Sequence, residues 1–146
     1  MSKITIEDFE EIRRGQLPFM AKFPARAEKI EAGRAIFRLS YSDGMLRPGG
    51  TINGPAMMAL ADMTMYAVVM SKIGKATMAV TSNLNMNFLR RPGQRDLIAE
   101  GRMLKLGRRL AYGEVTMYSD GDPDPVAHAT VTYSVPPDHE NSDSIA

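Results

Sequence analysis

Asp62 is the residue whose type and setting most need a chemical explanation. It is the only charged residue between Arg47 and Lys72, in a run whose apolar residues recur around the whole circumference of a helix. An ionised carboxylate in such surroundings is destabilising by several kcal/mol unless a partner compensates it. At helical spacing, only Tyr66 could donate a hydrogen bond to it. Asp62 therefore pairs with a basic residue from elsewhere or faces water, or it acts as a general base or nucleophile.

The start of the same helix offers a second candidate group. Asn53 is a favourable N-cap and Pro55 suits the first turn, and an ordinary helix cap explains both residues. Gly54 keeps a free backbone N–H at the positive end of the helix, and four glycines between residues 44 and 54 would let a ligand approach the backbone. Such an N–H can polarise a carbonyl group.

Gly54 and Asp62 of one chain cannot serve one carbonyl. They are eight residues apart in the sequence. On a single helix this is about 12 Å along the axis, at about 1.5 Å per residue. If both act in one site, they must come from different copies of the helix. A two-fold dimer would bring Gly54 of one chain near Asp62 of the other and would contain two such sites.

The remaining sequence predicts the elements that position these residues. Thr5 and Asp8 have capping-box spacing and predict a short helix within residues 1–24. Two strands joined at Gly33 fill residues 25–42, the apolar helix covers 55–74, and period-two patterns predict four strands over 78–88, 96–106, 109–119 and 126–135. A helix that is apolar on all sides requires an antiparallel sheet to curl around it. We expect one α+β domain over residues 1–146, with a flexible tail at 137–146.

Two segments carry a resemblance to a known family: NGPAMMALAD (residues 53–62) and SNLNMNFLRRPG (residues 82–93). With the order of elements between residues 25 and 136, they resemble hotdog-fold thioesterases of the phenylacetate-degradation type. The resemblance implies a curved antiparallel sheet wrapped around a long central helix. It implies that Asp62 is the catalytic carboxylate, that the Gly54 N–H binds the thioester carbonyl, and that Thr81 assists the attacking water. The family usually has a His-Gly-Gly turn where this chain has Asn53, Gly54 and Pro55.

The resemblance also implies a substrate and an assembly. We expect hydrolysis of an acyl-CoA to the free acid and coenzyme A, by a homodimer whose sheets join edge to edge and whose dimers pair again. Arg90 and Arg91 are candidates for binding the phosphates of coenzyme A, although a solvated strand end explains them equally well. Met58 and Asn83 complete the candidate substrate-binding residues, with the reservation that methionines in so apolar a helix are more often core residues.

Two other functions follow from the departures from the family pattern. Asn53 cannot titrate and Pro55 lacks an N–H, so a non-catalytic acyl or acyl-CoA binding domain is the alternative function. A hotdog dehydratase is disfavoured, because the sequence has no Asp and His pair at helical-turn spacing to move protons.

Composition excludes several further classes. The chain has no Cys and only two His, so we expect no metal site and no thiol nucleophile. Its formal net charge of +1 argues against nucleic-acid binding. Phosphate-loop and dinucleotide motifs are absent, so we expect no cofactor apart from coenzyme A within the substrate. An acidic N-terminal segment and the charge of Asp62 in the longest apolar stretch lead us to expect a cytoplasmic protein without a membrane span.

Overall fold

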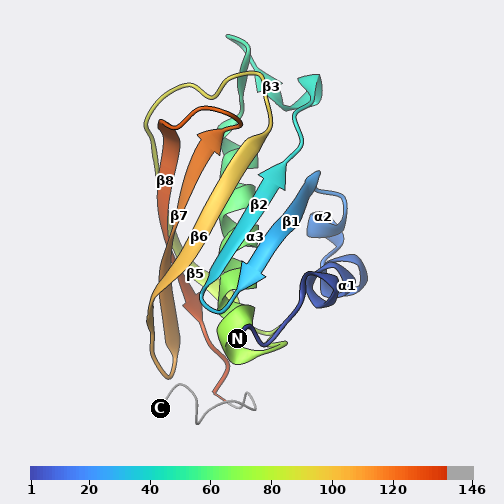
Figure 1. The fold of residues 1–146 in the computed structure, drawn as a ribbon, viewed down its shortest axis with the longest axis vertical. Coiled ribbons are helices and arrows are strands. Elements are labelled where there is room, and N and C mark those ends of the chain that lie inside the picture. Colours follow the sequence, from blue (N-terminus) through green and yellow to red (C-terminus); the bar gives the residue numbers. More distant parts are fainter. Residues whose placement is uncertain (138–146) are drawn as a thin grey trace.

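The computed structural model describes residues 1–137 and consists of one curved antiparallel sheet that lies across a long helix (Figure 1). The sheet has six strands in the order β1-β2-β6-β7-β8-β5. Their bounds are β1 (Ala25–Glu31), β2 (Arg34–Leu39), β5 (Val80–Phe88), β6 (Leu97–Leu106), β7 (Leu110–Ser119) and β8 (Pro125–Ser134). The predicted α+β hotdog architecture is confirmed, and each predicted strand is found within a few residues of its expected bounds.

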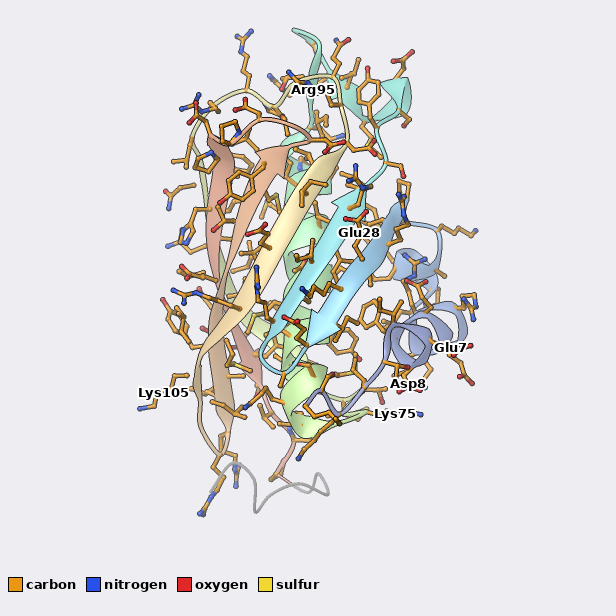
Figure 2. All side chains as sticks on the ribbon, viewed as in Figure 1. Glu7, Asp8, Glu28, Lys75, Arg95 and Lys105 are labelled. Carbon is orange, nitrogen blue, oxygen red and sulfur yellow. The ribbon has the colours of Figure 1, made fainter. Side chains whose placement is uncertain are left out.

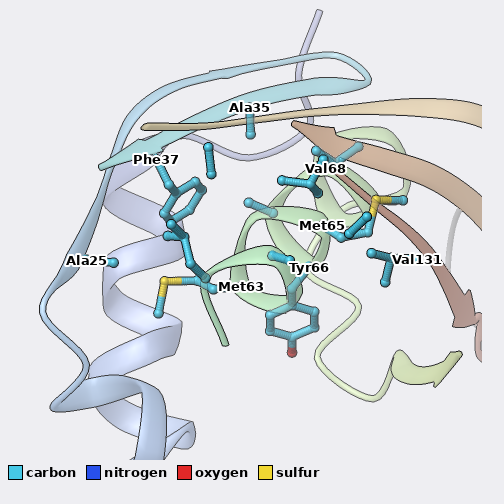
Figure 3. Close-up of a cluster of buried hydrophobic side chains, with 14 of the residues drawn as sticks. Ala25, Ala35, Phe37, Met63, Met65, Tyr66, Val68 and Val131 are labelled. Carbon is cyan, nitrogen blue, oxygen red and sulfur yellow. The ribbon is translucent and has the colours of Figure 1, made fainter. Parts of the chain in front are cut away.

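The central helix α3 (Gly54–Ile73) forms the core with the concave face of the sheet. Met63, Met65 and Val68 are fully buried among residues of the facing strands, such as Phe37 and Val131 (Figure 3). The helix begins at the N-cap Asn53 and ends at the C-cap Gly74 with a positive φ of 93°, as the sequence predicts. Every residue of α3 from 63 to 71 is buried, and Lys72 is the exposed residue near the end of the helix.

The central helix is longer than the apolar stretch within it. That stretch covers residues 56–70, whereas α3 has 20 residues, about the length of a membrane span. By length and composition alone it is the one helix among the described residues that could cross a membrane, and 72% of its most apolar window is buried inside the structure. The sheet covers this helix, and a buried core helix of this length passes the same test of length and composition.

The N-terminal segment packs beside β1, at the edge of the sheet opposite β5 (Figure 1). It forms α1 (Ile6–Gln16) and the short α2 (Pro18–Ala21). The predicted capping box is present, because Thr5 accepts from the Asp8 N–H while the Asp8 side chain accepts from the Thr5 N–H. Asp8 also lies 3.5 Å from the Lys75 ammonium, and Figure 2 shows the two side chains at the same end of the molecule.

The segment between β2 and α3 has more structure than its Gly-rich sequence predicts. It contains a 3-10 turn (Asp43–Met45) and a small hairpin of β3 (Leu46–Arg47) and β4 (Thr51–Ile52). Gly49 and Gly50 have positive φ angles of 102° and 76°, which the tight hairpin turn requires. This hairpin brings Arg47 close to the start of α3. The predicted tail lies outside the described residues from 138 onward.

Candidate active site

Two hydroxyl groups hold the carboxylate of Asp62 through the same oxygen atom. Thr81 Oγ1 donates to Asp62 Oδ1 at 2.5 Å, and the Tyr133 hydroxyl donates to the same Oδ1 at 2.7 Å. No described residue donates to Oδ2, and this atom is not among the buried polar atoms that lack a partner. No described basic side chain lies within ion-pair distance of Asp62. The carboxylate is therefore anchored on one oxygen and open to solvent on the other.

A β-bulge in the edge strand β5 places Thr81 beside Asp62. Thr81 pairs with Tyr133 of β8, but the next pair is Asn83 with Thr132, so that Ser82 is an extra residue. Strict alternation from Leu84 would have turned Ser82 toward the helix and Thr81 away from it. The bulge reverses this order. The period-two pattern over residues 78–88 therefore predicts the wrong facing for the residues before Asn83. Thr81 faces the carboxylate, as the resemblance implies.

Tyr133 is a functional-site residue that the sequence analysis missed. It lies on β8 among inward-facing apolar residues, is 3% exposed, and stacks on Tyr66 with ring centroids 5.8 Å apart. Burial raises the pKa of its phenol far above the ordinary value, and the negative charge of Asp62 raises it further. Tyr133 is therefore a protonated donor at every physiological pH. The available sequence signal for this role was that Tyr133 is the one hydroxyl-bearing residue among the inward-facing, otherwise apolar residues of β8.

Tyr66 does not have the role that helical spacing suggests. Its hydroxyl donates to the Thr77 carbonyl at 2.9 Å, and its pKa is raised by burial and by the charge of Asp62. The donors to Asp62 come from strands β5 and β8 instead. The spacing of residues along a helix carries no information about side chains that reach it from distant strands. The helix sequence alone could therefore not identify these donors.

Asn53 holds the start of α3 in place. Its side-chain oxygen accepts from the Ala56 N–H at 2.7 Å, and its amide nitrogen donates to the Met45 carbonyl at 2.8 Å. Pro55 has no N–H, and no described group accepts from the N–H of Gly54. The turn therefore presents one free backbone donor at the positive end of a 20-residue helix.

A pocket of about 380 Å³ opens at this helix end. Gly54 and the buried Met57 line it together with the ends of β5 and β4, and three arginines surround it: Arg47, Arg90 and Arg91. Arg90 is also 3.5 Å from Asp124, an exposed pair that leaves most of its donors free. Arg47 was not among the predicted residues, because its neighbourhood depends on the small β3-β4 hairpin. The pocket combines an apolar floor with a strongly positive rim.

Asp62 does not line this pocket, and one chain does not bring it to Gly54. Both residues belong to the stripe that the sheet leaves uncovered in the first half of α3, together with Pro55, Met58 and Ala59. Met58 is 42% exposed and is the exception among the helix methionines, which are otherwise buried core residues. The uncovered stripe is continuous with β5, whose outer edge has no partner strand within residues 1–137.

Asn83 is a predicted site residue that lies apart from both Asp62 and the arginine-lined pocket. It pairs with Thr132 of β8, which belongs to the outward-facing set of that strand, so Asn83 lies on the outer face of the sheet. The structure does not bring it together with Asp62 or with the arginine-lined pocket. Within residues 1–137 no group of three or more His, Asp or Glu side chains has the geometry of a metal site.

Comparison with known proteins gives consistent results. Residues 49–126 match the family described as Thioesterase superfamily. A structure described as a "putative thioesterase" from a Silicibacter species superposes with a TM-score of 0.83 at 36% identity, over 94% of this chain and 95% of that chain. A mutant structure of the phenylacetic acid degradation protein PaaI from Thermus thermophilus has a TM-score of 0.72 at 26% identity, over 82% and 99%. A curated protein of Thermoplasma acidophilum named "Putative esterase" is 28% identical over 97 residues, 66% of this chain and 73% of that protein.

Proposed function

This chain belongs to the thioesterase superfamily, and on that premise we propose that it hydrolyses acyl-CoA thioesters in a site shared between two copies of the chain. The family supports hydrolysis of a thioester or ester in general. The acyl-CoA substrate, the shared site and the roles of individual residues are the finer parts of the proposal.

The observation that carries the proposal is the setting of Asp62. Its carboxylate has no basic partner among the described residues, two hydroxyls hold Oδ1, and Oδ2 is free. A carboxylate that stabilised the fold through a salt bridge would have a cation beside it, and one that did so through hydrogen bonds alone would have donors on both oxygens. Asp62 instead keeps an unoccupied oxygen on the uncovered face of α3, where it can remove a proton from water or attack a carbonyl carbon.

The second copy supplies the missing half of the site. Suppose that two α3 helices pack antiparallel about a two-fold axis with Gly54 of one copy facing Asp62 of the other. Met58 lies midway between these two residues in the sequence, so it faces Met58 of the other copy. The exposed Met58 therefore lies at the axis and not in an acyl pocket. The unpaired edge of β5 and its exposed apolar side chains Val80 (57%) and Phe88 (53%) support a partner on this side.

The proposed reaction needs water and no cofactor. The thioester carbonyl oxygen accepts a hydrogen bond from the Gly54 N–H, which stabilises the negative charge that forms on it. Oδ2 of the partner copy's carboxylate takes a proton from water as the water oxygen attacks the carbonyl carbon. The tetrahedral intermediate then expels the coenzyme A thiolate, which takes the proton from the Asp62 carboxyl. In the alternative route Oδ2 itself attacks and expels the coenzyme A thiolate. Water then cleaves the resulting anhydride, which releases the free acid, restores the Asp62 carboxylate and supplies the proton that the thiolate takes.

Thr81 has a narrower role in this proposal than the resemblance implies. Its single hydroxyl proton points to Asp62 Oδ1, so it can hold the attacking water only as an acceptor. Asn53 acts by orienting the turn, since both its side-chain groups bond to backbone. The pocket formed with Arg47, Arg90 and Arg91 suits the phosphates of coenzyme A, because arginine forks bind phosphate oxygens through two donors.

Thiol release from a panel of acyl-CoAs, measured with a thiol reagent, tests the proposal. We expect turnover by the native protein and a loss of at least about a hundredfold in Asp62→Asn. Unchanged turnover in the variant would remove Asp62 from the mechanism. Binding without thiol release from any substrate would favour the alternative, a non-catalytic acyl-CoA binding domain. Oxygen-18 transfer to Asp62 in a single turnover would distinguish the nucleophile from the general base.

A further inference from the structure

The buried tyrosine of the last strand has a position that the mechanism above does not use. The Tyr133 hydroxyl lies 2.7 Å from Asp62 Oδ1 and 3.1 Å from the backbone carbonyl oxygen of the same residue. It therefore touches Asp62 at two points, one on the side chain and one on the main chain. Thr81, its direct cross-strand partner, donates to the same Oδ1.

Packing fixes the position of this hydroxyl. The Tyr133 ring is nearly parallel to the Tyr66 ring, at 17° and with centroids 5.8 Å apart. The Tyr66 ring is in turn held by its hydroxyl bond to the Thr77 carbonyl and by an edge contact with Phe9. Three elements, α1, α3 and β8, thus hold the phenol rigidly, as is required of a group that orients another.

Two donors on one oxygen restrict what the carboxylate can do. An aspartate with free rotation about its last bond exchanges its two oxygens, so each would face the substrate for part of the time. With Oδ1 bonded to both hydroxyls, this rotation would break two hydrogen bonds to a charged acceptor. Oδ2 therefore stays on the open side. A protonated phenol cannot accept a proton from water, so Tyr133 acts through Asp62 and not on the substrate.

We propose that Tyr133 is a positioning residue that, together with Thr81, locks Oδ1 of Asp62 and makes Oδ2 the single reactive oxygen. This inference rests on the proposed function. The titratable groups that interact with Asp62 within the described chain are Tyr133 and Tyr66, and no described Lys, Arg or His side chain forms an ion pair with it.

Tyr133→Phe tests the proposal, because it keeps the stacked ring and removes only the hydroxyl. We expect kcat to fall about 10- to 100-fold with KM nearly unchanged. The carbon-13 chemical shift of the Asp62 carboxyl at pH 7 should also change, because the carboxylate loses one of its two donors. Tyr112→Phe is the matched control, since Tyr112 is 41% exposed and lies on β7; it should keep the native kcat and the native chemical shift.

The outcomes separate positioning from a structural role. A native kcat in Tyr133→Phe would overturn the proposal, provided that circular dichroism shows a folded variant. A lower kcat with an unchanged chemical shift of the Asp62 carboxyl would also overturn it, because a structural defect lowers the active fraction without changing the bonding of the carboxylate.

A measurement without turnover keeps this inference separate from the proposed function. Carbon-13 spectra of labelled aspartate carboxyls at pH 7, with Asp62→Asn for assignment, report the bonding of the Asp62 carboxylate directly. We expect its chemical shift in Tyr133→Phe to differ from that in the native chain, and its chemical shift in Tyr112→Phe to be unchanged. If the native protein releases no thiol, the acyl-CoA hydrolysis proposal fails, while this difference in chemical shift still supports the positioning contact and its absence overturns it.

Discussion

Gly54 and Asp62 lie on the face that the sheet leaves uncovered in the first half of α3, at opposite ends of a short stripe. The free N–H of Gly54 opens into the arginine-lined pocket, whereas Asp62 lies two turns farther along the helix and does not reach it. The separation along the axis is about 12 Å, several times the reach of a hydrogen bond. In the proposed mechanism each group is thus half of a site, and the arrangement makes a specific prediction about mixed dimers.

Two inactive variants should restore activity when they share a dimer. Gly54→Pro removes the free N–H, and Asn53 already has the extended backbone that a following proline requires, with ψ of 151°. Its kcat should fall about 100- to 1000-fold, like that of Asp62→Asn. Co-refolding the two variants at equal amounts gives half mixed dimers, each with one intact site. We therefore expect about a quarter of the native activity.

Gly54→Ala is the matched control for this experiment. It keeps the N–H, and its Cβ would lie at ordinary contact distance, 3.4 Å, from the Phe88 ring. It should retain most of the native kcat, which separates the loss of the donor from any crowding of the pocket. No recovery in the mixture, under conditions that exchange subunits, would mean that the two groups act within one chain or not at all.

A cross-link at Met58 tests the register of the helix pair. The chain contains no Cys, so Met58→Cys introduces a single thiol. If Met58 faces its own copy across the two-fold axis, mild oxidation should convert most of the variant to a covalent dimer on a non-reducing gel. Phe19→Cys is the control, because Phe19 is 71% exposed but lies on α2, at the other edge of the sheet. Equal cross-linking of both variants would indicate random collision.

Most of the fold could be predicted because its signals are local. The periodicity of the central helix, its N-cap Asn53 and its C-cap Gly74 lie within or beside the element they define. The alternation of Ala35, Phe37 and Leu39 likewise predicts the buried face of β2, and all three are 0% exposed. The small β3-β4 hairpin was missed because two-residue strands are too short to show a period.

The candidate site was less predictable because it depends on pairing between distant strands. Asp62 is identifiable from the sequence because it is a charged residue in an apolar segment. Thr81 is a candidate only because of the family resemblance, since the alternation pattern predicts that its side chain faces away from the helix. The bulge that turns it inward and the contact with Tyr133 are properties of the β5-β8 register. Nothing in the sequence near residue 81 or residue 133 encodes that register, so it became visible only in the folded chain.

The arginines of the pocket should matter only for substrates that carry phosphates. Arg91→Ala should raise KM for an acyl-CoA about 5- to 10-fold and leave kcat nearly unchanged, because a lost phosphate contact weakens binding in the ground state and transition state alike. The same acyl group on N-acetylcysteamine, which has no phosphates, should give equal KM values for variant and native protein. Arg108→Ala, in the hairpin between β6 and β7, is the control. Equal effects on both substrates would place Arg91 against the acyl group instead.

Substitution of Gly113 should change the stability of the protein and leave its activity unaffected. It lies on β7 facing the helix, and a Cβ there would be 2.5 Å from Met65 Cε and 2.6 Å from the Arg102 carbonyl oxygen. Gly113→Ala should lower the free energy of unfolding by about 1–3 kcal/mol, because the backbone oxygen cannot move aside. Gly15→Ala in α1, with nothing within 4 Å, should be neutral or stabilising by up to about 1 kcal/mol. Urea denaturation of both variants measures the difference, and equal stabilities would show that the sheet can relax at Gly113.

Asp96 should make part of the stability depend on pH. The Tyr41 backbone N–H donates to its Oδ1 at 2.8 Å and Arg38 to its Oδ2 at 3.1 Å; the pKa of Asp96 is lowered, chiefly by the bond from Tyr41. A lowered pKa means that the stabilisation is complete above the ordinary carboxyl value and is lost as the pH falls through the lowered one. Asp96→Asn should therefore reduce the free energy of unfolding by about 1 kcal/mol at pH 7, and the difference from the native protein should vanish below the lowered pKa of Asp96.

Denaturant titrations of Asp96→Asn at several pH values, with the exposed Glu11→Gln as control, measure this dependence. The control should follow the native curve, because Glu11 forms no ion pair and no side-chain hydrogen bond within residues 1–137. A constant difference between Asp96→Asn and the native protein, from pH 7 down through the lowered pKa of Asp96, would contradict the expectation. It would mean that Asp96 stabilises the link between β2 and β6 through the shape of its side chain, and that its charge and its bond to Tyr41 contribute little.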